Sequence, residues 1–193
     1  MAKVVYKLGN DVYTDVIYPG RYMATVLPTE TPQYAFADDA TFNEVLKKGI
    51  TPGSVIVAAD NFGCGSSREH AVWAITDAGI KVVIAESFAD IFFNNSAKNG
   101  LLLIQLPKEA VEKLQKCDGS VTVDLESQTV KSSNGDSFKF DYDPFRKYCL
   151  LGGLDDIDYI LSYENEIDSF RSANTRDWMK IGTEPRKKAA TMA

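Results

Sequence analysis

The stretch SVIVAADNFGCGSSREHAVWAITDAGIKVVIAES, Ser54 to Ser87, contains two apolar runs of strand length, SVIVAAD and KVVIAES. Between them, apolar residues recur at helical spacing: Ala71, Ala74, Ile75 and Ala78. Gly79 follows the last of these residues and ends the helical pattern. A strand, a helix and a second strand in this order are joined by a right-handed crossover into a parallel sheet. The stretch therefore predicts the core of an α/β fold.

The alternation continues on both sides of this stretch. Further helices are predicted in ATFNEVLKKG, FADIFFNNSAKNG and KEAVEKLQKC, and further strands in VVYKL and GLLLIQLP. VTVDLES and SFKFDYD, with an Asn134–Gly135 turn between them, have the pattern of antiparallel strands. The segment 24–39, rich in turn residues, reads as a long ordered loop. We expect a mainly parallel sheet flanked by helices.

The C-terminal part of the chain has a different pattern. From Pro144 onward the sequence is helical, with apolar residues at Leu154, Ile157, Ile160 and Leu161. We therefore expect a main domain over residues 1–143 and a helical extension over 144–180. Residues 181–193 are expected to form a loose tail.

Composition excludes several classes of protein. The 193 residues carry a net charge of −6, which argues against nucleic acid or an anionic membrane as the main partner. No apolar run is long enough to span a bilayer, and the N-terminus has no apolar secretion signal. The three widely spaced cysteines suggest reduced thiols in a cytoplasmic protein. No CxxC motif or cysteine–histidine pair is present, so we expect this chain alone to bind no zinc ion or iron–sulfur cluster.

The segment NFGCGSSREHA, Asn61 to Ala71, lies where the first apolar strand gives way to the following helix, which we expect to begin at about Ser67. Ligands bind at this edge of open α/β sheets. Gly63 and Gly65 allow a sharp turn and a close approach of the backbone to a ligand. Serines at 66 and 67 favour a helix N-cap, and a helix start favours an anion. Arg68 adds a planar donor group that matches a carboxylate.

Several other motifs fit this segment poorly. A dinucleotide-binding motif requires a third glycine where Arg68 stands, and a P-loop requires GK[ST]. A nucleophile elbow requires GxSxG, which GCGSS does not supply. The remaining alternative is that this segment is only a well-capped helix start that binds no ligand. A cap alone does not require the adjacent Arg-Glu-His.

Several spaced motifs, in order, resemble the small subunit of 3-isopropylmalate dehydratase, the swivelling β/β/α domain of the aconitase superfamily. They are TDVIYPGRY, VIVAADNF, GCGSSREHA, ESFADIFFNNSAKNGLL and LLGGLDDIDYILSYENEIDSF. The resemblance implies a large subunit that carries a [4Fe-4S] cluster, in a heterodimer or heterotetramer. The two subunits together would dehydrate a 2-hydroxy acid and rehydrate the alkene at the neighbouring carbon, here in leucine biosynthesis. No cofactor or metal is implied for this chain itself.

The resemblance also implies roles for individual residues. Ser66 matches the family's catalytic base, Ser67 and Arg68 match residues that bind a substrate carboxylate, Arg21 matches a second arginine near the substrate, and Thr14 and Asp15 match the TD pair beside the active site. A serine hydroxyl is a poor base unless its alkoxide is stabilised, and helix N–H groups with Arg68 could supply that stabilisation. His70 is expected to orient its neighbours rather than to carry protons.

Substrate choice is expected to depend on the segment after Arg21, which in this family touches the variable group of the substrate. The predicted specificity loop is Tyr22, Met23, Ala24 and Thr25, and it contains no arginine. An apolar loop suits an isopropyl group, because an unpaired carboxylate buried there would be costly. Homoaconitate-type, citramalate and dimethylmalate substrates remain alternatives.

Two interpretations from other classes stay open. One is a stand-alone serine hydrolase in which His70 and Asp15 activate Ser66, since Ser66 and His70 are four residues apart. The other is a non-catalytic module that binds small dicarboxylates or a partner protein. Activity that appears only after mixing with an iron–sulfur subunit would favour the dehydratase over both of these alternatives.

Overall fold

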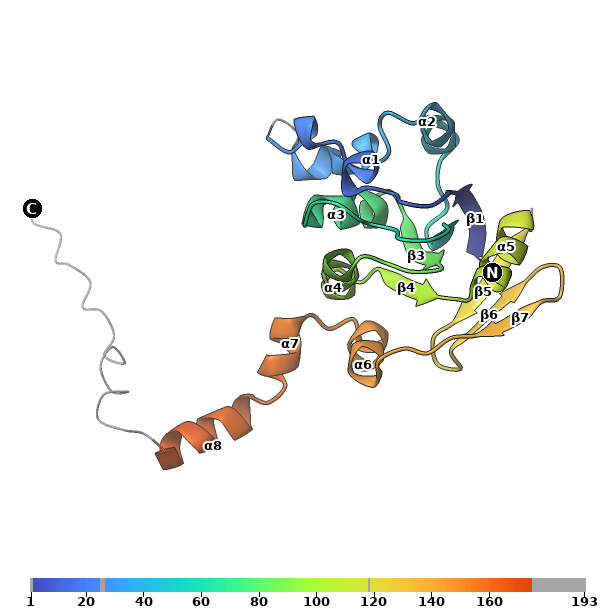
Figure 1. Cartoon of the computed structure of the whole chain (residues 1–193). Coiled ribbons are helices and arrows are strands. Elements are labelled where there is room, and N and C mark those ends of the chain that lie inside the picture. Colours follow the sequence, from blue (N-terminus) through green and yellow to red (C-terminus); the bar gives the residue numbers. More distant parts are fainter. Residues whose placement is uncertain (1, 25–26, 118, 175–193) are drawn as a thin grey trace, which may run out of the picture. The chain divides into compact units, whose positions relative to one another are not determined.

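The computed structural model describes residues 2–24, 27–117 and 119–174, and the chain divides into two compact units, Met1–Asp155 and Asp156–Ala193. The first unit contains one seven-stranded sheet with the strand order β4-β3-β2-β1-β5-β6-β7 (Figure 1). The strands are β1 (Ala2–Lys7), β2 (Ser54–Val57), β3 (Ile80–Ala85), β4 (Leu102–Gln105), β5 (Ser120–Asp124), β6 (Thr129–Ser132) and β7 (Ser137–Lys139). Strands β1 to β4 pair in parallel, and β5 to β7 continue the sheet in antiparallel pairs beginning at β1. The predicted mixed α/β fold with a parallel core is confirmed.

Helices connect these strands. They are α1 (Thr14–Ile17), α2 (Ala40–Lys48), α3 (Glu69–Asp77), α4 (Asp90–Lys98), α5 (Lys108–Lys116) and α6 (Pro144–Gly152), with two 3₁₀ helices, η1 (Gly20–Tyr22) and η2 (Pro28–Tyr34). The second unit contains, in its described part, α7 (Asp156–Leu161) and α8 (Glu164–Asn174). None of the described helices is both long and apolar enough to cross a membrane.

Side chains that alternate along the parallel strands form two separate cores, one on each face of the sheet. In β2, Ile56 belongs to one core, whereas Val55 and Val57 belong to the other. All four residues of β2 are buried. Because both faces of a parallel sheet are covered, its strands read as unbroken apolar runs, which is why they were visible in the sequence.

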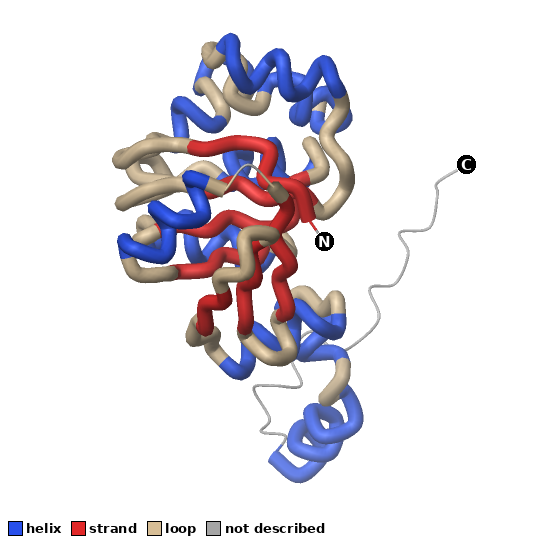
Figure 2. The backbone as a smooth tube through the Cα atoms, turned by 90° about the vertical axis from the view of Figure 1, so that its right-hand side faces the viewer, coloured by secondary structure: helices blue, strands red, loops and turns tan. Residues whose placement is uncertain are grey.

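The direction of the crossovers determines which helices cover which face. The chain passes from β2 to β3 to β4, always toward the same edge of the sheet. Right-handed crossovers in one direction place their helices on the same face, and α2, α3 and α4 all contribute to the Ile56 core. Helix α5 and the antiparallel strands contribute to the opposite core. Figure 2 shows the strands running side by side with helices around them.

The structure departs from the sequence-based expectations at several elements. Segment 24–39, which was expected to be a long ordered loop, contains the 3₁₀ helix η2. Strand β6 was not predicted, and the Asn134–Gly135 turn joins β6 to β7 rather than the two predicted strands. The C-terminal helical region is broken after α6, where Gly153 has a left-handed φ of 63°. The domain boundaries at 143 and 180 stay predictions, and the expected tail lies outside the described residues.

Gly63 provides a test of how tightly the turn after β2 is packed. Its φ is +80°, and a Cβ atom there would lie 2.2 Å from Cγ of Phe92. We expect Gly63→Ala to lower the free energy of unfolding by roughly 2–5 kcal/mol, since it adds an overpacked contact to a left-handed backbone strain. Denaturant unfolding of the purified chain measures this loss.

Gly100→Ala is the matched control, because Gly100 has a φ of +70° and open space around its Cβ position. It should cost only about 1 kcal/mol, the backbone part of the effect. Equal losses for the two variants would show that the contact with Phe92 is unimportant.

Candidate active site

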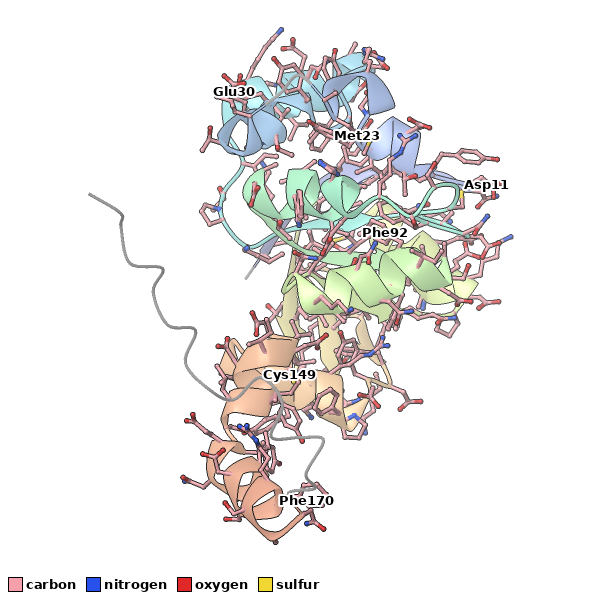
Figure 3. All side chains as sticks on the ribbon, turned by 90° about the vertical axis from the view of Figure 1, so that its left-hand side faces the viewer. Asp11, Met23, Glu30, Phe92, Cys149 and Phe170 are labelled. Atoms are coloured by element: carbon pink, nitrogen blue, oxygen red, sulfur yellow. The ribbon has the colours of Figure 1, made fainter. Side chains whose placement is uncertain are left out.

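The turn between β2 and α3 is built from left-handed backbone. Asn61, Gly63 and Gly65 have φ values of 60°, 80° and 96°. The N–H of Gly63 donates to the carbonyl of Val12 at 2.8 Å, and a Cβ on Gly63 would collide with Phe92, which Figure 3 labels on α4. The turn is thus held between the N-terminal segment and α4. It delivers the next residues, Ser66 to Arg68, to the edge of the sheet.

Thr14 joins the first turn of α1 to this loop. Its N–H donates to the carbonyl of Cys64 at 2.8 Å, and its hydroxyl donates to the carbonyl of Ser66 at 3.0 Å. Thr14 is buried, with 2% of its surface exposed. Gly65 has a φ of +96°, a conformation that favours glycine, and a Cβ there would lie at an ordinary contact distance of 3.5 Å from the Thr14 hydroxyl oxygen. The pairing fixes the backbone on which the Ser66 side chain is carried.

Arg68 and Asp15 form an ion pair beside this loop. Nη1 of Arg68 donates to Oδ1 of Asp15, which also accepts from the N–H of Gly20 at 3.1 Å. The Arg68 side chain is 21% exposed and that of Asp15 is 58% exposed. The hydrogen bond from Arg68 is the largest effect that lowers the pKa of Asp15. A Cβ on Gly20 would lie 3.2 Å from Nη1, so a glycine at this position leaves room for the guanidinium.

Arg21 is held by a different carboxylate. Its Nη1 donates to Oδ2 of Asp38 at 2.9 Å, and its Nη2 donates to Oδ1 of the same residue. The guanidinium also lies over the ring of Tyr22, 4.6 Å from the centroid. The hydrogen bond from Arg21 lowers the pKa of Asp38. Each candidate substrate arginine is therefore held by an aspartate of the same chain.

The structure thus brings Thr14, Asp15, Ser66 and Arg68 together, while Arg21 lies after Gly20 at the start of the specificity loop. Ser66 and Ser67 are exposed on the turn. In the specificity loop, Met23 is 38% exposed and Ala24 is also exposed, whereas Thr25 lies outside the described residues.

The predicted helix start at about Ser67 was placed too early. Helix α3 begins at Glu69, and Arg68 occupies the N-cap position without a side-chain hydrogen bond to the first turn. The serines precede the helix, so their predicted role as caps is wrong. Their hydroxyl groups are carried on the turn at the sheet edge instead.

The first turn of α3 is held by residues that the sequence-based reasoning missed. Asn99 donates from Nδ2 to Oε1 of Glu69 at 2.8 Å, and its Oδ1 accepts from Nε1 of Trp73 at 2.9 Å. Asn99 ends α4, thirty residues from Glu69. No local pattern links positions so far apart in sequence, so no signal for this network was available.

His70 packs against aromatic rings. It stacks on Tyr18 with a centroid distance of 5.9 Å, and its ring centroid lies 4.7 Å from that of Trp73. In the part of the chain that the structure describes, His70 makes no hydrogen bond to Ser66, which the hydrolase alternative requires. The expected role of His70 in orienting its neighbours stays a prediction.

Cys64 is a free cysteine on the turn. Burial is the largest effect that raises the pKa of the Cys64 thiol, and the charge of Asp11 adds to it. A raised pKa disfavours the reactive thiolate, and Cys64 lies between the two glycines of the turn. Across residues 2–24, 27–117 and 119–174, no group of three or more His, Cys, Asp or Glu side chains could hold a metal ion.

Comparison with known proteins first defines the class. The family model for the aconitase C-terminal domain matches residues 20–109, which include the turn, α3 and most of the parallel sheet. A second model, LeuD_N, matches residues 118–144. The part of the site that contains Arg21, Ser66 and Arg68 therefore lies within the segment that is similar to the aconitase C-terminal domain.

More similar proteins narrow the assignment. The 3-isopropylmalate dehydratase small subunit of Ruegeria sp. (strain TM1040) is 47% identical over 184 residues, covering 88% of this chain and 92% of the relative. The protein of the same name from Francisella tularensis subsp. novicida is 46% identical, covering 85% and 90%. The crystal structure of 3-isopropylmalate dehydratase (leuD) from Methanocaldococcus jannaschii has a TM-score of 0.69 and 37% identity, covering 86% of this chain and 95% of that chain. The chain belongs to the family of 3-isopropylmalate dehydratase small subunits.

The ion pair at Asp15 yields a prediction in solution. Replacing Arg68 with glutamine removes the charge and the hydrogen bond that favour the carboxylate, so the pKa of Asp15 should rise toward its ordinary value. Because the native pKa is lowered, the pair favours folding at neutral pH, and this contribution is lost as the pH falls through that pKa. Carboxyl ¹³C NMR titration measures the pKa.

Arg21→Gln is the matched control for this titration. It should raise the pKa of Asp38 and leave that of Asp15 unchanged, because each arginine has its own aspartate. An Asp15 pKa that does not move in Arg68→Gln would contradict the described pair.

Proposed function

We propose that this chain is the small subunit of a heteromeric hydro-lyase that interconverts 2-isopropylmalate and 3-isopropylmalate in leucine biosynthesis. The observation that carries the proposal is its likeness to proteins of that name, at 47% and 46% identity over most of both chains. The geometry of the turn after β2 supports it, because a hydroxyl and a guanidinium lie two residues apart at a sheet edge. In the proposed reaction the hydroxyl serves as the base and the guanidinium binds a substrate carboxylate.

We assign the base to Ser66. In its deprotonated alkoxide form, the Ser66 oxygen would take a proton from the carbon next to a substrate carboxylate, while hydroxide leaves from the neighbouring carbon and the alkene forms. The proton and the hydroxide removed together make up one water. Addition of water in the opposite sense then gives the isomer. Thr14 holds the Ser66 carbonyl at 3.0 Å, which limits movement of the reacting residue. The N–H of Arg68 donates to the same carbonyl at 2.9 Å, so the turn is fixed from two sides.

We assign substrate carboxylate binding to Arg68 and Ser67, with Arg21 as a second contact. A guanidinium binds a carboxylate through two parallel hydrogen bonds. Asp15 contacts Nη1 of Arg68, so the rest of this donor group can face a ligand. Asp15 and Thr14 thereby act as positioning residues, one for the guanidinium and one for the serine backbone.

We propose that the partner is a large subunit that carries a [4Fe-4S] cluster. The relatives are named small subunits, which supports a second subunit in the assembly. When bound, such a cluster supplies a Lewis acid for the hydroxyl group that leaves. Ser66 and Ser67 are exposed on this chain, and a base of this kind works best where water is excluded. A partner surface over the turn would provide that exclusion.

The assembly is proposed to work in the reducing cytoplasm. The structure describes Cys64, Cys117 and Cys149 as free thiols, and Cys117 and Cys149 are buried. Three unpaired cysteines suit a reducing compartment.

We propose that the segment after Arg21 selects an apolar substituent. Met23 is partly exposed, Leu27 is 63% exposed, and the residues 22–25 contain no cationic side chain that would pair with an extra carboxylate. Isopropylmalate carries an aliphatic group at this position, whereas homoaconitate-type substrates carry a charge. An unpaired carboxylate would lose hydration without compensation.

Ser66→Ala tests the base assignment in the complex with the large subunit. Turnover should fall about a hundredfold to ten-thousandfold with little change in KM, because a proton-transfer group is lost while the carboxylate contacts stay. Ser137→Ala, at an exposed position on β7, is the control and should be as active as the wild type. Turnover within a few-fold of wild type in Ser66→Ala would refute the assignment.

Met23→Arg tests the specificity loop in the same complex. Isopropylmalate turnover should fall, since the new charge has no partner beside an aliphatic group, and substrates with an additional carboxylate should gain relative to it. Met23→Leu keeps the loop apolar and should leave the kcat/KM ratio between substrates unchanged. Identical substrate preference in Met23→Arg and wild type would show that this loop does not determine the choice of substrate.

A further inference from the structure

Tyr18 is a buried tyrosine that the proposed reaction does not use. Only 1% of its surface is exposed. It is the C-cap residue of α1, the helix that begins with Thr14 and Asp15, and its N–H donates to the carbonyl of Thr14 at 2.9 Å. One helical turn therefore joins Tyr18 to the two residues that hold the Ser66 backbone and the Arg68 guanidinium.

The hydroxyl of Tyr18 contacts the specificity loop and η2. It donates to the carbonyl of Tyr22 at 3.5 Å, which is the long end of the hydrogen-bond range, and it is also hydrogen-bonded to the hydroxyl of Thr31. Thr31 is itself buried, with 3% of its surface exposed. Burial is the largest effect on the phenol and raises the pKa of Tyr18, so the group stays protonated and can donate at neutral pH. A buried hydroxyl with two partners in the same chain holds the loop rather than a substrate.

Aromatic rings extend this support. The ring of Tyr18 stacks on that of His70 with an interplanar angle of 17°. The ring of Tyr22 lies 6.4 Å from that of Tyr18 between centroids, and it packs on Tyr34 of η2 at 4.3 Å. Aromatic pairs at these distances attract each other. Because His70 belongs to α3, the rings link the helix that follows the turn to the specificity loop.

We propose that Tyr18 is a positioning residue for substrate specificity, which holds Tyr22 and thereby the loop that faces the variable group of the substrate. This inference rests on the proposed function. The hydroxyl of Tyr22 accepts from Nη2 of Arg21 at 3.2 Å, and the Arg21 guanidinium lies over the Tyr22 ring. Met23, which Figure 3 labels, and Ala24 follow Tyr22 directly and are exposed. A shift of Tyr22 would therefore move the second substrate arginine together with the apolar residues of the loop.

Tyr18→Phe tests this role in the complex with the large subunit. It removes the hydroxyl and keeps a ring that can stack on His70. The KM for 2-isopropylmalate should rise about two- to tenfold, the usual effect of one lost hydrogen bond. The kcat should stay within about twofold of wild type, because the Ser66 turn keeps its hydrogen bond to Thr14.

Citramalate, as a competing ligand, reports whether the change concerns the substituent of the substrate. It carries a methyl group where 2-isopropylmalate carries the isopropyl group, so it has less to lose when the loop shifts. Its competition constant should change less than the KM for 2-isopropylmalate in Tyr18→Phe. Equal changes for the two ligands would contradict a role in selecting the substituent.

Hydrogen exchange in the isolated chain tests the hold on the loop without the reaction. The N–H groups of Tyr22 and Met23 donate to main-chain carbonyls of the same turn. In Tyr18→Phe the segment 19–24 should exchange about two- to tenfold faster, because a less firmly held loop opens more often. The segment 63–68 should exchange as in the wild type.

Tyr142→Phe is the matched control. Tyr142 is a partly buried tyrosine that packs against the core on the opposite face of the sheet, and burial is the main effect that raises its pKa to about 12. Removal of its hydroxyl should leave the KM, the competition by citramalate and the exchange of segment 19–24 at their wild-type values.

The outcomes separate this inference from the proposed function. An unchanged KM for Tyr18→Phe in an active complex would overturn the inference, whatever the exchange rates. A fall in kcat with an unchanged KM would do the same and would assign Tyr18 to the Ser66 turn. An inactive wild-type pair would refute the proposed function, and the exchange of segment 19–24 would then decide by itself whether Tyr18 holds the loop.

Discussion

The left-handed backbone at Gly63 and Gly65 is the constraint on which the rest of the site depends. Gly63 must accommodate the ring of Phe92 at a distance that leaves no space for a Cβ atom. At Gly65 the φ of +96° is the main constraint, since a Cβ there would lie 3.3 Å from Cδ1 of Tyr13 and 3.5 Å from the Thr14 hydroxyl oxygen. Only glycine adopts this conformation readily without a side chain to displace. The two positions together let α4 and α1 close on the turn from different directions.

The contacts of α1 and α4 with the turn fix the positions of the candidate catalytic groups. The turn leaves β2, a strand buried on both faces, so its starting point is rigid. Thr14 then holds the Ser66 carbonyl, and Asp15 holds the Arg68 guanidinium. A hydroxyl and a cation are thus presented together by a framework whose two halves are about fifty residues apart in the sequence. Preorganised groups of this kind need little rearrangement when a substrate binds.

Which helices, strands and contacts could be predicted from the sequence depends on how far apart the interacting residues lie along the chain. Strands β2, β3 and β4 and the helices between them were predicted because burial on both faces leaves continuous apolar runs. Strand β6 has four residues and only one buried valine, Val130, so it carried too little signal. The prolines of η2 suggested a loop, but Pro28 occupies the start of this 3₁₀ helix, where proline is tolerated, and Pro32 lies inside it.

The site shows the same limit. Ser66 and Arg68 were singled out by the turn motif, and Thr14 and Asp15 through resemblance to a family. The structure joins the four residues in two pairs, Thr14 with the Ser66 carbonyl and Asp15 with Arg68. Asp38 and Asn99, which hold Arg21 and Glu69, were missed because their partners lie far away in the sequence and their local surroundings carry no motif.

The most direct test of the central claim compares this purified chain, alone and mixed with its iron–sulfur large subunit under anaerobic conditions, in an assay for interconversion of 2-isopropylmalate and 3-isopropylmalate. The account predicts no turnover by the chain alone and robust turnover by the mixture. Isomerisation by the chain alone, or none by a mixture that has formed a complex with an intact cluster, would contradict it.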